Sequence, residues 1–287
     1  MTISDLQTPF QAQMTWAPPS AQVPVREGWV DVPGTRLFYW DTGGNGEPIV
    51  LLHPATGSAA IWLYQQPVFA AAGYRVIAYS RRGHVPSQRG DEGSHGTASA
   101  DLHLLVEHLG LDRFHIVGSA AGGFIVPDYA LSHPERLASM VIASSQGGGE
   151  DPHYRATIQR IASKQFIDMP ASFRELGPSY RAGNPEGVTQ WEELEHKALF
   201  GGRIRQPNEN ALTWENLARI KVPALMFTGD ADLYIPPWLM MEYARHIPGR
   251  ETAIIPGAGH SAYWEQPEIF NKLVLDFVAR HPIKTSS

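Results

Sequence analysis

The sequence predicts an α/β protein whose central, mostly parallel sheet is covered by helices on both faces. Three observations support this prediction: short apolar runs alternate with helical segments, a glycine-rich turn joins one run to a helix, and the alternation stops once and then resumes. Near-continuous apolar runs are typical of parallel strands that are buried on both faces. The chain has 287 residues, 43% of them hydrophobic, which leaves room for one such core and an insertion.

The elements follow one another in a regular order. Residues 1–26 form a polar, proline-bearing arm, which we expect to lie on the surface or to reach a partner subunit in a homodimer; a disordered segment is the alternative. Residues 27–41 predict a hairpin around Pro33-Gly34-Thr35. The segments after the hairpin predict strands at 48–52, 74–79, 114–117, 137–143, 222–228 and 253–255, and helices at 58–72, 97–109 and 124–132.

The alternation breaks over residues 147–212, which we interpret as a helical cap with helical pieces at 154–165 and 186–199. The predicted core then comprises residues 27–146 and 213–287. Ligands of open α/β sheets bind beyond the carboxyl ends of the strands, so a cap there would close the site and select the substrate. We expect the cap to supply an apolar pocket from these residues, although most of them would pack the cap onto the core: Tyr154, Phe166, Met169, Phe173, Tyr180, Trp191 and Phe200.

The charged residues of this insertion could bind substrate or could simply be exposed to solvent. Arg174 and Arg181 either pair with a substrate carboxylate or are exposed, and exposure is commoner for arginine. The glutamates at 192, 193 and 195 fit a solvated helix face.

The turn Gly118-Ser119-Ala120-Ala121-Gly122 has the setting of a nucleophile elbow, a Gly-x-Ser-x-Gly turn between a strand and a helix. Small residues two places before and after the centre put the centre at position 120, which holds Ala. Centring the turn on Ser119 would place the β-branched Val117 where the backbone needs room. A phosphate-binding turn is the other interpretation, but the Lys-Ser/Thr of a P-loop is absent.

A carboxylate and a histidine follow two later strands. Asp232 lies three residues past Gly229, and His260 follows Pro256-Gly257-Ala258-Gly259. Together with position 120 they give the chain order nucleophile, Asp, His, in which the imidazole moves the proton and the carboxylate orients it. We prefer Asp232 to Asp230, which fits a turn residue that bonds its own backbone.

The loop after the strand at 48–52 completes the predicted site. It reads His53-Pro54-Ala55-Thr56-Gly57. An oxyanion hole in this setting uses one N–H from this loop and one from the residue after the nucleophile, which would be Ala55 and Ala121. Pro54 has no N–H, and we expect His53 to anchor the loop.

These segments resemble the α/β-hydrolase superfamily from about Gly28 onward. His53-Pro54 is similar to its His-Gly segment, and Arg82-Gly83-His84-Val85-Pro86-Ser87 to its Arg-Gly-x-Gly-x-Ser segment. The run from His260 to Pro267 resembles its histidine loop and final helix start. The resemblance implies the α/β-hydrolase fold and a Ser-Asp-His triad in which Ala120 replaces the nucleophile. Branches of the superfamily with Asp there usually carry Trp next, whereas this chain has Ala121, so serine is favoured as the missing residue.

Composition and charge limit the classes of binding partner and cofactor that we expect. A net charge of −6 argues against nucleic acid or an anionic membrane as partner. No apolar run is long enough for a transmembrane helix, and the first residues lack the order of a signal peptide, so we expect a cytoplasmic protein. The chain contains no cysteine, and its 12 histidines show no ligand spacing, so neither a metal nor a cofactor is implied.

We therefore expect a hydrolase of a small or medium apolar ester or lactone, inactive here because of Ala120. Two alternatives remain open. One is a non-catalytic ligand-binding member of the fold. The other is C–C hydrolase or cofactor-independent oxygenase chemistry that relies on His260 as the base.

Overall fold

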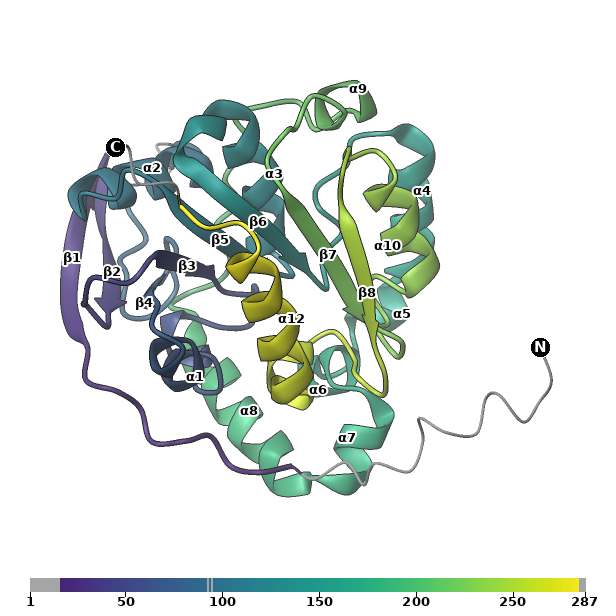
Figure 1. The fold of residues 1–287 in the computed structure, drawn as a ribbon. Helices are drawn as coiled ribbons and strands as arrows, with labels where there is room; N and C mark the ends of the chain where they lie inside the picture. Colours follow the sequence, from purple (N-terminus) through teal and green to yellow (C-terminus); the bar gives the residue numbers. More distant parts are fainter. Residues whose placement is uncertain (1–15, 92, 94, 284–287) are drawn as a thin grey trace.

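The computed structural model describes residues 16–283 except Glu92 and Ser94, and these residues form an eight-stranded sheet with helices around it (Figure 1). The strands are β1 (Arg26–Val32), β2 (Thr35–Asp41), β3 (Pro48–Leu52), β4 (Arg75–Tyr79), β5 (Phe114–Ser119), β6 (Leu137–Ala143), β7 (Ala224–Gly229) and β8 (Glu251–Ile255). They lie in the order β1-β2-β4-β3-β5-β6-β7-β8. Strand β2 is antiparallel to β1 and β4, and the remaining pairs are parallel. The predicted sheet is confirmed.

Helices cover both faces of the sheet, and others lie in the insertion. The helices of the described residues are α1 (Gln66–Ala71), α2 (Ala98–His108), α3 (Gly122–Ser132), α4 (Pro152–Ile161), α5 (Lys164–Ile167), α6 (Ala171–Glu175), α7 (Pro178–Gly183), α8 (Pro185–Ala198), α9 (Trp214–Leu217), α10 (Pro237–Ala244), α11 (Ala262–Glu265) and α12 (Pro267–Ala279), with short 3-10 turns η2 (Ala59–Ile61) and η3 (Pro134–Arg136). Figure 1 shows α1 and α12 on the near face of the sheet and α2 and α3 behind it. None of the described helices is long and apolar enough to cross a membrane.

Alternate side chains of β3 pack against the helices on opposite faces of the sheet. Ile49 and Leu51 pack in the cluster that contains the apolar residues of α1 and α12. Val50 and Leu52 point the other way, into the cluster that contains those of α2 and α3. Because both sets are buried, the strand reads as one continuous apolar run, which is the signal that predicted a covered parallel sheet.

Two predicted helices are interrupted in the structure. Residues 58–72 form η2, then an irregular stretch, then α1, which has Pro67 in its first turn. Proline fits the first turn of a helix but removes a hydrogen bond from a helix interior, so a single helix from 58 to 72 was wrong. Likewise, α4 ends at Ile161, and α5 begins after Ser163, whose hydroxyl caps the new helix by accepting from the Phe166 N–H at 3.3 Å.

The part of the arm that the structure describes lies against its own chain. The ring of Trp16 meets Tyr180 of α7 edge-on at 5.6 Å. Val23 exchanges two hydrogen bonds with the Gln66 side chain, at 3.0 and 2.9 Å. Residues 1–15 lie outside the described residues, so contact with a partner subunit stays a prediction.

Helices α4 to α8 lie between β6 and β7 in the chain, and Figure 1 shows α6 and α7 beyond the arrowheads of β7 and β8. The main-chain O of Glu175, the last residue of α6, accepts from the Ser261 N–H at 3.0 Å. This part of the insertion therefore touches the loop that carries His260. The boundaries of the cap at 147 and 212 stay a prediction.

Candidate functional site

Ala120 occupies the apex of the turn between β5 and α3. Its φ is +50°, one of two positive values among the described non-glycine residues. Its N–H donates to the Ala143 O at 3.0 Å, and its own O accepts from the Gly123 N–H at 3.0 Å. A non-glycine residue held in the left-handed region costs about 1–3 kcal/mol and is typical of functional turns.

The glycines on either side of Ala120 are required by close backbone approach. A Cβ on Gly118 would lie 2.6 Å from the Gly122 O, and one on Gly122 would lie 2.2 Å from the Leu52 O. Ser119 instead ends strand β5 and is fully buried, and its Oγ has no hydrogen-bond partner among the described residues. The turn is thus centred on position 120, in agreement with the spacing of the glycines.

Asp232 and His260 form a buried pair. The His260 Nδ1 lies 2.9 Å from Oδ2 and 3.0 Å from Oδ1 of Asp232. The carboxylate also accepts from the Thr228 Oγ1 at 2.8 Å and from the N–H groups of Tyr234 and Ile235 at 2.8 and 3.0 Å. These donors fix the carboxylate, so it can fix the tautomer of the imidazole. Asp230, by contrast, accepts from the N–H of Gly257, 27 residues further along the chain, at 2.8 Å, so it joins two loops and does not bond its own turn as predicted.

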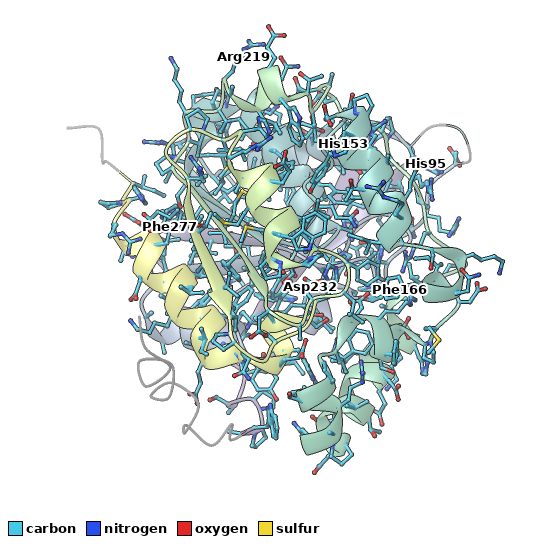
Figure 2. All side chains as sticks on the ribbon, turned by 90° about the vertical axis from the view of Figure 1, so that its right-hand side faces the viewer. His95, His153, Phe166, Arg219, Asp232 and Phe277 are labelled. Atoms are coloured by element: carbon cyan, nitrogen blue, oxygen red, sulfur yellow. The ribbon has the colours of Figure 1, made fainter. Side chains whose placement is uncertain are left out.

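The electrostatics around His260 favour its protonated form. Burial lowers the pKa of His260, but the charge and hydrogen bond of Asp232, with further contributions from Glu175 and Glu265, raise that pKa above its ordinary value. Figure 2 labels Asp232 in the loop beside the insertion, where Phe166 of α5 is also labelled. Phe166 meets the Tyr234 ring at 5.0 Å, and Tyr234 meets the His260 ring at 4.5 Å.

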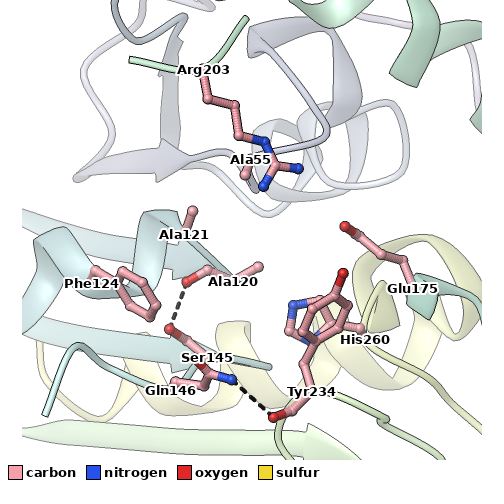
Figure 3. A pocket seen from close by; sticks show the side chains of 10 residues that line it. All are labelled: Ala55, Ala120, Ala121, Phe124, Ser145, Gln146, Glu175, Arg203, Tyr234 and His260. Carbon is pink, nitrogen blue, oxygen red and sulfur yellow. Dashed lines mark hydrogen bonds between the residues drawn. The ribbon is translucent and has the colours of Figure 1, made fainter. Parts of the chain in front are cut away.

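Ala55 and Ala121 lie beside Ala120 and His260 around one cavity of about 160 Å³ (Figure 3). Outside helices and strands, neither alanine N–H donates to another described residue. His53, next to this loop, is fully buried, with its Nδ1 at 2.7 Å from the Pro54 O and its Nε2 accepting from the Arg81 N–H at 3.0 Å. Both ring nitrogens of His53 are thereby used in holding the loop.

The insertion contributes charged residues to the cavity, not the expected apolar ones. The cavity is lined by Ala55, Ala120, Ala121, Phe124, Ser145, Gln146, Glu175, Arg203, Tyr234 and His260. None of the apolar residues expected to form the pocket is among them: Tyr154, Phe166, Met169, Phe173, Tyr180, Trp191 and Phe200. Tyr154, Tyr180 and Trp191 are buried in packing, whereas Phe200 is 68% exposed. The prediction of an apolar pocket from these residues was wrong.

The arginines singled out in the sequence also lie elsewhere. Arg174 donates to the Met169 O at 2.9 Å and to the Tyr234 hydroxyl. Arg181 donates to the carbonyls of Phe173 and Leu176. Arg203 is the arginine that lines the cavity, and it makes no ion pair with another described residue. Sequence reasoning missed Glu175 and Arg203 because neither belongs to a motif.

A second buried glutamate connects the insertion to the histidine loop. Glu265 accepts from the Gly177 N–H at 2.7 Å and from the Gly259 N–H at 3.0 Å. Burial raises the pKa of Glu265 to about 8, although these backbone N–H groups oppose the increase. Within the described ranges, no group of three or more His, Asp or Glu side chains is arranged to hold a metal ion.

Comparison with known proteins identifies the family of this chain. Residues 49–273 match the model of the alpha/beta hydrolase family. A 2-hydroxy-6-oxononadienedioate/2-hydroxy-6-oxononatrienedioate hydrolase of Paraburkholderia phymatum is 30% identical over 284 residues, which cover 93% of this chain and 98% of the relative.

Solved structures agree on the fold. A structure described as an N-acyl homoserine lactone degrading enzyme is 26% identical, with a TM-score of 0.69 over 87% of this chain and all of that one. A bromoperoxidase of Bacillus anthracis is 22% identical, with a TM-score of 0.71 over 88% of this chain and all of its own, and supports the fold alone. The chain belongs to the alpha/beta hydrolase family.

Proposed function

We propose that this chain is a serine hydrolase of esters or lactones whose nucleophile is replaced by Ala120, so that the chain binds its substrate without cleaving it. One observation carries the proposal: Ala120 sits at the strained apex of the elbow, on the same cavity as His260, Ala55 and Ala121. The site thus keeps the base and the two N–H groups that acyl transfer needs and lacks only the attacking atom.

The chemistry of the restored site follows from these positions. With Ser at position 120, its Oγ would attack the carbonyl carbon while the His260 Nε2 takes the hydroxyl proton, and Asp232 would stabilise the imidazolium. The Ala55 and Ala121 N–H groups would hold the oxyanion, and each such donor is typically worth about 3–4 kcal/mol of barrier. Water would then hydrolyse the acyl-enzyme by the same base. Since the N–H groups belong to the main chain, Ala120 leaves them in place.

The cavity wall refines the expected substrate. Ala55, Ala120, Ala121 and Phe124 present apolar surface, while Glu175 and Arg203 face them from the insertion. We therefore propose a small substrate that is apolar near the scissile carbonyl and polar at its other end. In this proposal residues 147–212 act as a cap that selects that polar end.

A second candidate reaction is hydrolysis of a C–C bond. The relative named as a 2-hydroxy-6-oxononadienedioate hydrolase acts, by its name, on a dicarboxylate. Arg203 brings a positive charge to the cavity and makes no ion pair with another described residue. An oxo-carboxylate would fit that charge. A ligand receptor without catalysis is a third candidate, although a receptor would not need the buried Asp232–His260 pair.

The test is to restore the nucleophile. The Ala120→Ser variant and the parent are assayed on aryl esters, lactones and an oxo-carboxylate with a cleavable C–C bond, and both are treated with a fluorophosphonate label. We expect hydrolysis and labelling at position 120 in the serine variant only, and loss of both when His260→Ala is added.

Matched controls separate the roles of the two aspartates. In the serine background, Asp232→Asn should lower kcat by about 10⁴-fold because the imidazole loses its tautomer, whereas Asp230→Asn should leave kcat nearly unchanged. A folded serine variant that neither hydrolyses any probe nor reacts with the label contradicts the hydrolase proposal and favours the receptor.

A further inference from the structure

Glu175 has no part in the chemistry proposed for the serine site, yet it is buried in the wall of the cavity. It is 5% exposed and ends α6 in the insertion. Figure 3 shows its carboxyl end directed toward the cavity, on the side of His260. A buried carboxyl group that faces a cavity and a base is a candidate for proton transfer.

The two carboxyl oxygens of Glu175 have different surroundings. Oε2 accepts from the Thr56 Oγ1 at 3.0 Å and lies 3.4 Å from the Ser261 Oγ. Oε1 has no hydrogen-bond partner among the described residues, and it is not enclosed by protein atoms. Since hydroxyl donors occupy Oε2, a proton on this carboxyl belongs on Oε1, where it points at whatever fills the cavity.

The charges around Glu175 come from several elements. Burial raises the pKa of the carboxyl above its ordinary value, while His260, the Thr56 hydroxyl, Arg203 and Arg174 oppose the increase. Tyr234 and Tyr263 also face the carboxyl, and the pKa of each phenol is raised, chiefly by burial. The neutral carboxyl is therefore favoured by burial and opposed by its cationic neighbours.

We propose that Glu175 is a further catalytic residue, a proton donor that works with His260 as an acid–base pair on carbonyl compounds and needs no nucleophile at position 120. The pair would interconvert the keto and enol forms of a bound carbonyl compound. This activity shares the His260 base and the two N–H groups with the proposed function, but it belongs to the chain as it stands, with Ala120.

The reaction balances without any other reactant. The His260 Nε2 takes a proton from the carbon next to the carbonyl, and the electron pair of that C–H bond moves to form the C=C bond while the C=O pair moves onto oxygen. The Ala55 and Ala121 N–H groups stabilise the enolate oxygen, and the Glu175 Oε1 proton moves to it. The products are the enol, a Glu175 carboxylate and a His260 imidazolium, and the reverse steps return the ketone.

The position of Thr56 supports this geometry. Thr56 follows Ala55 in the chain, and its hydroxyl holds the Glu175 carboxyl. The proton donor and one N–H of the oxyanion hole are thereby fixed to adjacent residues of one loop. Arg203, which lines the same cavity without an ion-pair partner among the described residues, favours a 2-oxo acid as the class of compound.

The test follows proton exchange on 2-oxobutanoate in D₂O. Exchange at C3 is measured by the loss of the C3 proton signal in NMR, with the unmodified chain, with Glu175→Gln and with His260→Ala. Glu192→Gln is the matched control, because Glu192 also lies in the insertion but bonds the Ser172 hydroxyl at 2.5 Å and does not line the cavity. The fold of each variant is checked by circular dichroism and urea unfolding.

We expect the unmodified chain to accelerate exchange, Glu175→Gln to slow it by about 10²-fold and Glu192→Gln to leave it unchanged. The rate of the unmodified chain should fall at high pH as Glu175 loses its proton, and the Gln variant should lack this alkaline limb. A purely structural role for Glu175 would not remove one limb of the pH profile.

Two results overturn the inference. One is a folded Glu175→Gln variant that exchanges as fast as the unmodified chain with the same pH profile. The other is an unmodified chain that does not exchange the C3 protons faster than buffer. If Ala120→Ser hydrolyses esters in that second case, the proposed function stands while the role of Glu175 does not, so the two proposals fail separately.

Discussion

Adjacent alanines in the elbow offer a direct measurement of its strain. Ala120 has a φ of +50°, whereas Ala121 has a φ of −64° in the ordinary helical region. Glycine adopts positive φ without steric cost, so the same substitution should have opposite effects at the two positions. We predict that Ala120→Gly stabilises the protein and that Ala121→Gly destabilises it.

The magnitudes follow from the two backbone conformations. A left-handed conformation costs a non-glycine residue about 1–2 kcal/mol, and glycine removes that cost. Glycine also increases the entropy of the unfolded chain, which offsets about 0.4–1 kcal/mol of the gain. The expected net effect of Ala120→Gly is a stabilisation of about 0.5–1 kcal/mol. Ala121→Gly relieves no strain and increases the entropy of the unfolded chain by the same amount, so it should cost about 0.4–1 kcal/mol.

The assay is urea unfolding followed by tryptophan fluorescence, for which the chain provides 8 tryptophans. The free energy of unfolding of each variant is compared with that of the unmodified chain. When the dependence of this free energy on urea concentration has the same slope in both proteins, a change in the unfolding midpoint reports a change in stability. If both variants are destabilised to the same extent, the strain assigned to position 120 is absent and the elbow argument fails.

Two further predictions test the packing and the titration of the site. Gly122→Ala should destabilise the protein by about 1–3 kcal/mol, because its Cβ would lie 2.2 Å from the Leu52 O. The control is Gly110→Ala, whose Cβ meets nothing within 4 Å and which should cost only the left-handed strain of about 1–2 kcal/mol. Equal urea midpoints for a fully folded Gly122→Ala variant and the unmodified chain would contradict this prediction. Because the folded-state pKa of Glu265 is raised from 4.5 to about 8, the folded chain binds the extra proton between those values, and this group should make stability fall as pH rises through that interval. Glu265→Gln should flatten that part of the profile in urea unfolding from pH 4.5 to 8, and an unchanged slope would refute the assignment.

The sequence predicted the parts of the site that the backbone dictates. Gly118 and Gly122 are required by close main-chain contacts, and Asp232 and His260 follow the ends of neighbouring parallel strands, so motif spacing was enough to bring them together. The catalytic roles assigned to these residues stay predictions.

The wall of the cavity could not be predicted in the same way. Glu175 and Arg203 reach the cavity through the path of the insertion, which has no fixed relation to the sheet and no periodic pattern that marks a pocket-facing residue. The aromatic residues of the insertion were a misleading signal for the pocket, because Tyr180 and Trp191 pack in a buried core cluster and do not line the cavity. The interruption of the helix at 58–72 shows the same limit locally, because the role of Pro67 depends on where the helix starts.

The contacts of Glu265 have a consequence for hydrogen exchange. The Glu265 carboxyl group accepts hydrogen bonds from the N–H of Gly177, in the insertion, and from the N–H of Gly259, next to His260. Displacement of the Glu265 side chain would release both amides at once, so Glu265→Ala should lower the protection of the Gly177 and Gly259 amides together. The insertion and the loop that carries His260 are thus joined through one buried side chain, so a change at Glu265 should alter the order of both segments.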